Sequence, residues 1–141
     1  MGVMTLFMFL MMYALMYSMV DRFSNVYSNL NQICMAGLMT APMVIVEFAV
    51  MRSMYTDQRL NVLIIGLSLV VGATCWLGIR AQAGVGNEQF LRSMIPHHAG
   101  AILMCEQGGA RSKEIQRLCA GIIAGQQREI AEMKALLKEN N

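Results

Sequence analysis

Charged residues are scarce in this chain. Asp, Glu, Lys and Arg make up 14% of its 141 residues, whereas hydrophobic residues make up 56%. A soluble domain of average composition has about 25% charged and about 45 to 50% apolar residues, so an ordinary soluble protein is excluded. The net charge is only +2, and Lys and Arg are not clustered, which argues against a nucleic-acid partner.

Several common site motifs are missing as well. The four cysteines include no Cys-x-x-Cys pair, so a structural zinc site is not expected. The C-terminal part has no Glu-x-x-His motif of the kind that di-iron bundles use. We find no phosphate-binding glycine loop, no dinucleotide fingerprint and no nucleophile with a base. The protein is therefore expected not to be an enzyme.

Three long apolar runs are present instead, at residues 2–20, 33–51 and 61–79. A helix of about 20 residues crosses a hydrocarbon core of about 30 Å, whereas three strands cannot close a barrel. We predict an all-α protein in which residues 1–80 form three transmembrane helices in a lipid bilayer. The first run lacks the basic flank and cleavage site of a signal peptide, so we expect it to be retained.

The remaining residues predict an extramembrane antiparallel helical hairpin. Residues 81–87 are small and glycine-containing and form a flexible joint. Asn87 is predicted to cap a helix that runs from Glu88 to about Gln107. The GGARS sequence then ends this helix, and Ser112 is predicted to cap a second one that runs to about Lys138. Residues 88–141 thus form the hairpin domain.

Possible metal donors are concentrated in the stretch SMIPHHAGAILMCEQ. On a helical wheel Met94, His98 and Cys105 share one face, and His97 and Met104 lie on an adjoining stripe. Thioether and imidazole donors suit Cu(I) or Ag(I) better than hard cations. The alternative is that the methionines fill core gaps and the histidines are polar surface. Facing donors on the second predicted helix are Cys119, Gln126, Glu129 and Met133.

Proline is rare, with two residues in the chain. Pro96 lies inside the predicted first helix of the hairpin and has no N–H, so the carbonyl of Arg92 loses its helical donor. We expect a bend beside the histidines. Pro42 is expected to bend the second apolar helix in the same way.

The stretches EQFLRSMIPHHAGAILMCEQ and LCAGIIAGQQREIAEMKALL resemble the domain-of-unknown-function 305 family over about residues 87–137. The shared signature is Met-x-Pro-His-His, a downstream Met, and Gln-x-x-Glu-Ile-x-x-Met. The resemblance implies half of a ferritin-like four-helix bundle that binds copper outside the cytoplasm. Soluble members carry two hairpins, whereas this chain has one. The implied metal ligands are Met94, His97, His98, Met104 and Met133, with Gln126 and Glu129 at matching polar positions.

The cysteines lie outside that signature. Cys34 and Cys75 fall inside apolar runs and are expected to act as small buried apolar residues. Cys105 and Cys119 lie on facing sides of the hairpin. They form a disulfide only if the helices approach closely, because helix axes usually lie about 8 to 10 Å apart. A role beside copper is the alternative.

Methionine is abundant, with 15 residues, and most lie in the apolar runs. Glu47 is an ionisable residue within the second run. An ionisable group inside a membrane span is costly, so such residues are functional candidates. The methionines serve either packing and lipid contact or, in an oligomer, conduction of Cu(I). They form two stripes, Met4, Met8, Met12, Met16 and Met19 in the first run, and Met35, Met39, Met43 and Met51 with Glu47 in the second.

The sequence thus predicts a membrane-anchored protein that binds Cu(I), with Ag(I) as an alternative ion, in copper handling or metal resistance. The expected location is a bacterial inner membrane with the hairpin outside the cytoplasm, although basic residues are almost balanced across the membrane. A homo-oligomer is expected because two helices alone cannot bury both apolar stripes. A copper-handling partner protein is a further expectation. The alternative function is a metal-free adaptor whose hairpin docks a partner protein.

Overall fold

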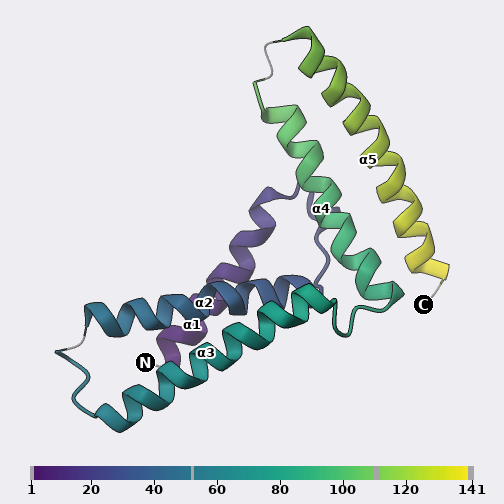
Figure 1. Cartoon of the computed structure of the whole chain (residues 1–141). Coiled ribbons are helices and arrows are strands. Elements are labelled where there is room, and N and C mark those ends of the chain that lie inside the picture. The colour runs from purple at the N-terminus through teal and green to yellow at the C-terminus, as the bar shows by residue number, and fades with distance from the viewer. Residues whose placement is uncertain (1, 52, 110–111, 140–141) are drawn as a thin grey trace. The chain divides into compact units, whose positions relative to one another are not determined.

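The structure is a computed structural model that describes residues 2–51, 53–109 and 112–139. In these ranges it contains helices and connecting segments but no strands (Figure 1). The predicted all-α class is therefore confirmed. The helices are α1 (Gly2–Leu15), α2 (Leu30–Val50), α3 (Gln58–Ala81), α4 (Asn87–Gln107) and α5 (Lys113–Glu139), with short 3-10 helices η1 (Met16–Met19) and η2 (Phe23–Asn25).

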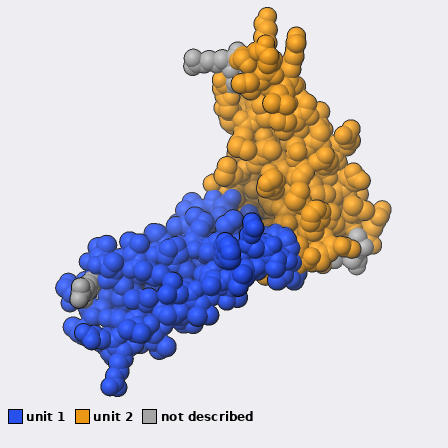
Figure 2. All heavy atoms as spheres, viewed as in Figure 1, with its two compact units in different colours: residues 1–16, 31–84 blue, residues 17–30, 85–141 orange. Residues whose placement is uncertain are grey.

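The chain forms two compact units (Figure 2). Unit 1 consists of residues 1–16 and 31–84, and unit 2 consists of residues 17–30 and 85–141. Residues 17–30, which connect α1 to α2, therefore belong with α4 and α5. The apolar pattern of the sequence does not indicate this assignment.

The three apolar helices are long and apolar enough to cross a membrane, judged by length and composition. Their ends differ from the predicted runs, because α2 begins at Leu30 and α3 extends from Gln58 to Ala81. The side chain of Asp57 accepts hydrogen bonds from the backbone N–H groups of Arg59 and Leu60. Capping therefore sets where α3 begins, and the helix includes polar residues that a hydropathy criterion leaves out.

Helices α2 and α3 pack through small residues. A Cβ atom added at Gly72 of α3 would lie 3.2 Å from the Cβ of Ala41 on α2. Small side chains allow backbones to approach closely, as in many membrane helix pairs. The buried residues of α2 recur every three or four positions and comprise Ala36, Gly37, Thr40, Ala41, Val44 and Phe48.

In unit 2, α4 and α5 lie side by side (Figure 1). The Cys105–Cys119 disulfide joins them, with 5.2 Å between the Cα atoms. The sequence allowed this disulfide only if the two helices approach closely, and at this point they do. Val20 and Tyr27 from the 17–30 segment also pack on the core of this pair. The buried core consists of Leu91, Ile95, Ala99, Ile102, Ile130, Met133 and Leu137.

The helix caps correct one prediction and confirm another. The N-cap of α4 is Gly86, without a side-chain cap, and Asn87 is already the first helical residue. The predicted Asn87 cap is wrong because the extended backbone ends one residue earlier, at Gly86. The Ser112 cap is confirmed, because its Oγ accepts a hydrogen bond from the N–H of Ile115 at 3.2 Å. In the joint, Gln82 and Gly84 both have positive φ angles, which turns the chain sharply after α3.

Candidate metal centre between α4 and α5

His98 is the polar centre of the contact between α4 and α5. Its residue is only 9% exposed. The Nδ1 atom lies 2.9 Å from the carbonyl oxygen of Met94, one turn earlier on α4. The Nε2 atom lies 2.8 Å from Oε2 of Glu129 on α5. The ring therefore joins α4 to α5 through Nε2, while Nδ1 contacts the backbone of its own helix.

This geometry restricts where protons can be. A carbonyl oxygen only accepts hydrogen bonds, so a hydrogen bond to Met94 requires a proton on Nδ1. The contact with Glu129 requires another proton, on either Nε2 or the carboxyl group. A metal ion can therefore reach the lone pair of Nε2 only if the His98–Glu129 contact opens and this proton leaves.

Two of the predicted sulfur donors lie on the same side of α4 and α5. Met133 is 8% exposed and belongs to the buried core. Met94 is half-buried and packs on that core. Met94 precedes His98 by one turn, and Met133 follows Glu129 by one turn, so all four residues follow one contact line. The structure brings Met94, His98 and Met133 together on the facing sides of α4 and α5, with the half-exposed Glu129 at the edge of this contact.

The other two predicted ligands face outward. His97 is exposed, and Met104 is 59% exposed. They are seven residues apart, about 10.5 Å along the axis of α4 at 1.5 Å per residue. The five residues predicted as a metal set therefore do not converge on one point within a single chain. They divide into an inner group, defined as Met94, His98 and Met133, and an outer pair, defined as His97 and Met104.

The remaining predicted donors have other partners or positions. The sulfurs of Cys105 and Cys119 are bonded to each other, so neither is a free thiol in this state. Gln126 is half-buried on α5, one turn before Ile130 of the core. No group of three or more His, Cys, Asp or Glu side chains that could hold a metal ion occurs within the described ranges. The inner group contains one histidine and two thioethers, so any site here depends on sulfur.

The segment 17–30 contributes contacts that sequence reasoning missed. The Nδ2 atom of Asn29 donates to the carbonyl oxygen of Arg92 at 3.4 Å. This carbonyl is the one that Pro96 deprives of its helical donor. Asn29 is 2% exposed, so the two groups satisfy each other away from solvent. The sequence indicated that the Arg92 carbonyl lacks its helical donor because of Pro96. It could not indicate the replacement donor, because Asn29 lies 63 residues away.

A second contact ties the same segment to α5. The Nζ atom of Lys134 donates to Oδ1 of Asn25 at 2.5 Å. Nδ2 of Asn25 donates to Oδ1 of Asp21 at 2.6 Å. Asn25 is buried, and this chain of polar contacts fixes the segment beside the inner face of unit 2.

In unit 1, Glu47 is paired with a tyrosine. The hydroxyl of Tyr55 donates to Oε1 of Glu47 at 2.9 Å, and this hydrogen bond raises the pKa of Tyr55 above its ordinary value of 10.0. Oε2 of Glu47 is buried without a hydrogen-bond partner among the described residues. The α2 methionines Met35, Met39 and Met43 are exposed on the outside of unit 1. They do not line a path within one chain.

Comparisons with known proteins bear on both units. Residues 79–140 match the model of a family described as domain of unknown function (DUF305). An uncharacterized protein of Acanthamoeba polyphaga mimivirus is 36% identical over 115 residues, which cover 79% of this chain and 72% of the viral protein. The family match spans less than half of the chain, whereas the similarity to the viral protein covers 79% of it. The similarity to the viral protein therefore includes residues before position 79. No solved structure matches the chain.

Proposed function

The chain belongs to the family of domain of unknown function 305, and on this premise we propose that it is a membrane-anchored protein that binds soft metal ions. The ions are Cu(I) and Ag(I), carried as cargo by methionine and histidine side chains of α4 and α5. The use of this binding is copper handling or metal resistance in a bacterial envelope. The proposal includes no catalytic step.

The observation that carries the proposal is the inner group, in which one imidazole and two thioethers lie along one contact line of α4 and α5. Thioethers are uncharged and soft, and they need no deprotonation. Met94 is half-buried and Met133 is buried. Such positions suit a soft monovalent ion, which prefers sulfur to oxygen ligands. These donors fit Cu(I) or Ag(I) and do not fit Mg²⁺ or Ca²⁺, which take several oxygen ligands.

Binding requires one local change. Nε2 of His98 must exchange Glu129 for the metal ion, and the proton of that contact is released to solvent. Nδ1 keeps its hydrogen bond to the carbonyl of Met94 and so holds the ring in orientation. Glu129 then remains beside the ion as a negatively charged neighbour. The inner face therefore needs side-chain rotation but no refolding of α4 or α5.

Membrane anchoring is supported by the surface of unit 1. Large apolar side chains are exposed on all three of its helices, including Phe7, Val46 and Leu69. Such a surface is unfavourable in water at about 25 cal/mol per Å², whereas lipid covers it without that penalty. The Cys105–Cys119 disulfide favours an oxidising compartment for unit 2. We therefore keep the expected topology, with α4 and α5 outside the cytoplasm.

A reporter fused after residue 141 tests this topology. An enzyme that is active only outside the cytoplasm should be active in this fusion, and one that is active only inside should be silent. The opposite pattern would reverse the topology. It would also remove the reason to expect the Cys105–Cys119 disulfide in the cell, because cytosolic thiols are kept reduced.

An Ag(I) titration of the full chain in mild detergent tests the metal site. Met133→Leu keeps the volume of a buried side chain and typically costs less than about 1.5 kcal/mol of stability, but it removes one sulfur donor. We expect Met94→Leu and Met133→Leu each to weaken Ag(I) binding by roughly tenfold or more. Met39→Leu, an exposed methionine of α2, is the matched control and should bind as the parent does.

Two results would contradict the proposal. The first is parent-like Ag(I) affinity in a chain that carries both Met94→Leu and Met133→Leu. The second is the absence of saturable binding in the parent itself. In either case the remaining reading is a metal-free adaptor, for which the exposed apolar residues Ile115 and Leu118 of α5 would offer a docking surface.

A further inference from the structure

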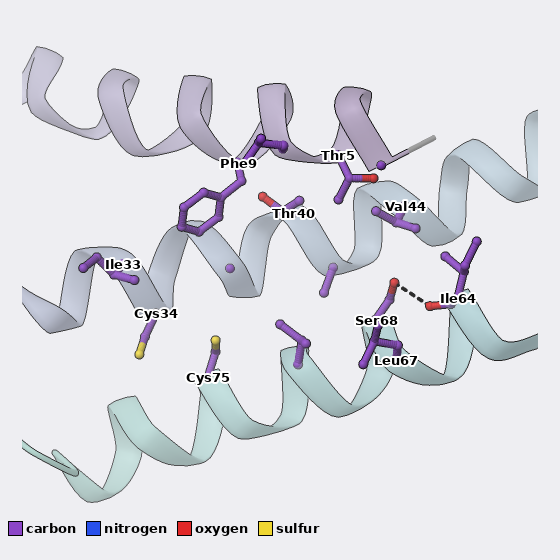
Figure 3. A pocket seen from close by; sticks show the side chains of 15 residues that line it. Thr5, Phe9, Ile33, Cys34, Thr40, Val44, Ile64, Leu67, Ser68 and Cys75 are labelled. Carbon is purple, nitrogen blue, oxygen red and sulfur yellow. Dashed lines mark hydrogen bonds between the residues drawn. The ribbon is translucent and has the colours of Figure 1, made fainter.

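The sequence predicted that Cys34 and Cys75 act as small buried apolar residues, and the structure leaves both only partly buried. Both are free cysteines, and they come from facing positions of α2 and α3. Figure 3 shows both sulfur atoms in the space between α2 and α3, and both residues line the same cavity. Two residues that are 41 positions apart thus form a thiol pair in unit 1.

Glycines make room for this pair. A Cβ atom added at Gly37 of α2 would lie 2.9 Å from Sγ of Cys75. A Cβ atom at Gly78 of α3 would lie 4.0 Å from Sγ of Cys34. Each sulfur therefore packs over a glycine of the opposite helix. Any larger residue at position 37 would force the Cys75 sulfur to move.

The pair opens on a cavity of about 520 Å³ within unit 1. Its lining includes no Asp, Glu, His, Lys or Arg. Two hydroxyl groups in the lining already donate to their own helices, Thr40 to the carbonyl of Ala36 and Ser68 to that of Ile64. Hard cations find too few oxygen ligands here, and zinc lacks the four ligands of its structural sites. The two sulfurs are the strongest metal donors of the cavity.

We propose that Cys34 and Cys75 form a second soft-metal site that takes one monovalent ion, Cu(I) or Ag(I), between two sulfurs. One thiol loses its proton and binds as thiolate, and the other donates a sulfur lone pair. The proton leaves to solvent, and no electron is transferred. The product is electrically neutral because the thiolate charge balances the ion, which suits an apolar cavity where an unpaired charge is costly.

The position of the pair in the helices allows an ion to enter. Cys34 lies near the start of α2 and Cys75 lies within two turns of the end of α3. At this end Nδ2 of the Asn31 side chain donates to Oε1 of Gln82 at 3.2 Å, and both residues are polar. The sulfurs therefore lie about one to two helical turns, at 5.4 Å per turn, from polar groups. This site uses no residue of α4 or α5 and does not depend on the function proposed above.

Alkylation of the full chain in detergent, mapped by mass spectrometry, tests the site. Enough Ag(I) to fill both proposed sites should slow modification of both Cys34 and Cys75 by N-ethylmaleimide by roughly tenfold or more. The protection should remain in Met94→Leu, which removes a donor of the α4–α5 site. In Cys34→Ser, the protection of Cys75 should be lost.

A glycine pair gives a sharper comparison that keeps both thiols. Gly37→Ala should displace the Cys75 sulfur, which is the end of a short side chain, and weaken protection by Ag(I) by roughly tenfold. Gly66→Ala on α3 is the matched control, because a Cβ atom there meets nothing within 4 Å. It should behave as the parent does.

Three outcomes would overturn the inference. Equal alkylation with and without Ag(I) would show that the thiols do not bind the ion. Full protection of Cys75 in Cys34→Ser would show that the pair is not needed. A Cys34–Cys75 disulfide in the protein as isolated would show that the pair is an oxidised crosslink. If the thiols fail these tests while Met133→Leu still weakens Ag(I) binding, the α4–α5 site stands alone.

Discussion

His97 and His98 are adjacent in the sequence but have different surroundings. Consecutive helical residues point about 100° apart, and here this step separates an exposed residue, His97, from one that is only 9% exposed, His98. His98 contacts Met94 and Glu129 through its two nitrogens. The family resemblance implies both histidines as metal ligands, whereas in the structure one is exposed and the other is buried between α4 and α5. His98 supports the α4–α5 contact even without metal.

We predict that His98→Ala lowers the free energy of unfolding of unit 2 by roughly 1 to 3 kcal/mol, because two hydrogen bonds and a buried ring are lost. His97→Ala is the control and should change it by less than about 0.5 kcal/mol, as exposed substitutions usually do. Urea unfolding of the metal-free protein, followed by the circular dichroism of the helices, measures both. Equal losses for the two variants would contradict the inward placement of His98.

For the outer pair, His97 and Met104, we expect no effect of substitution on stability. Because His97 and Met104 face outward, their replacement should leave the fold intact. Any loss of Ag(I) affinity in His97→Ala or Met104→Leu must then come from a site completed outside the single chain.

At the scale of elements, the 17–30 segment and α4 depend on each other. Pro96 leaves the carbonyl of Arg92 without its helical donor, and Asn29 supplies one. We predict that Asn29→Ala costs roughly 1 to 3 kcal/mol, because a buried acceptor loses its partner. The cost should be smaller when Pro96→Ala is also present, because the new N–H can donate to Arg92.

A double-mutant cycle with Asn29→Ala and Pro96→Ala measures this coupling by chemical unfolding. The expected coupling energy is about 0.5 to 3 kcal/mol, the range for residues in one hydrogen-bond network. Strict additivity of the two changes would mean that Asn29 does not replace the donor that Pro96 removes. Asn31→Ala, which removes an exposed hydrogen bond in unit 1, provides a control that should not couple to Pro96→Ala.

At the scale of the whole molecule, unit 2 is larger than the hairpin that was expected to need a partner. Val20 and Tyr27 cover part of its core, so some of the burial that we assigned to a second copy comes from the same chain. Apolar side chains nevertheless stay exposed on both helices, among them Phe90, Met104 and Leu118. A homo-oligomer remains our proposal, with the outer pair at or near the contact.

We predict that chemical crosslinking in native membranes gives a dimer. Met104→Glu, which places a charge on the outer face of α4, should reduce the dimer, because burial of an unpaired charge is costly. Glu106→Gln is a control on the same helix and should crosslink as the parent does. A dimer yield that is unchanged by Met104→Glu would place the contact elsewhere, and a strictly monomeric parent would remove the proposal.

The sequence by itself determined what depends on local spacing. Apolar runs and helical periodicity predicted an all-helical protein with three long apolar helices, and the Ser112 cap followed from its position before a helix. The Met-x-Pro-His-His stretch led to the family that the comparisons support. These features arise from residues within a few turns of one another, so a linear pattern records them.

Only the tertiary structure decided which distant residues meet. It joined residues 17–30 to unit 2 through Asn29, paired Cys34 with Cys75 over two glycines, and turned His98 inward while His97 stayed exposed. Such contacts depend on how helices pack and rotate against one another, and packing is set by the shapes of both surfaces together. A spacing rule that acts within one helix contains no information about its neighbour, so the donor groups could be listed from the sequence but not sorted into sites.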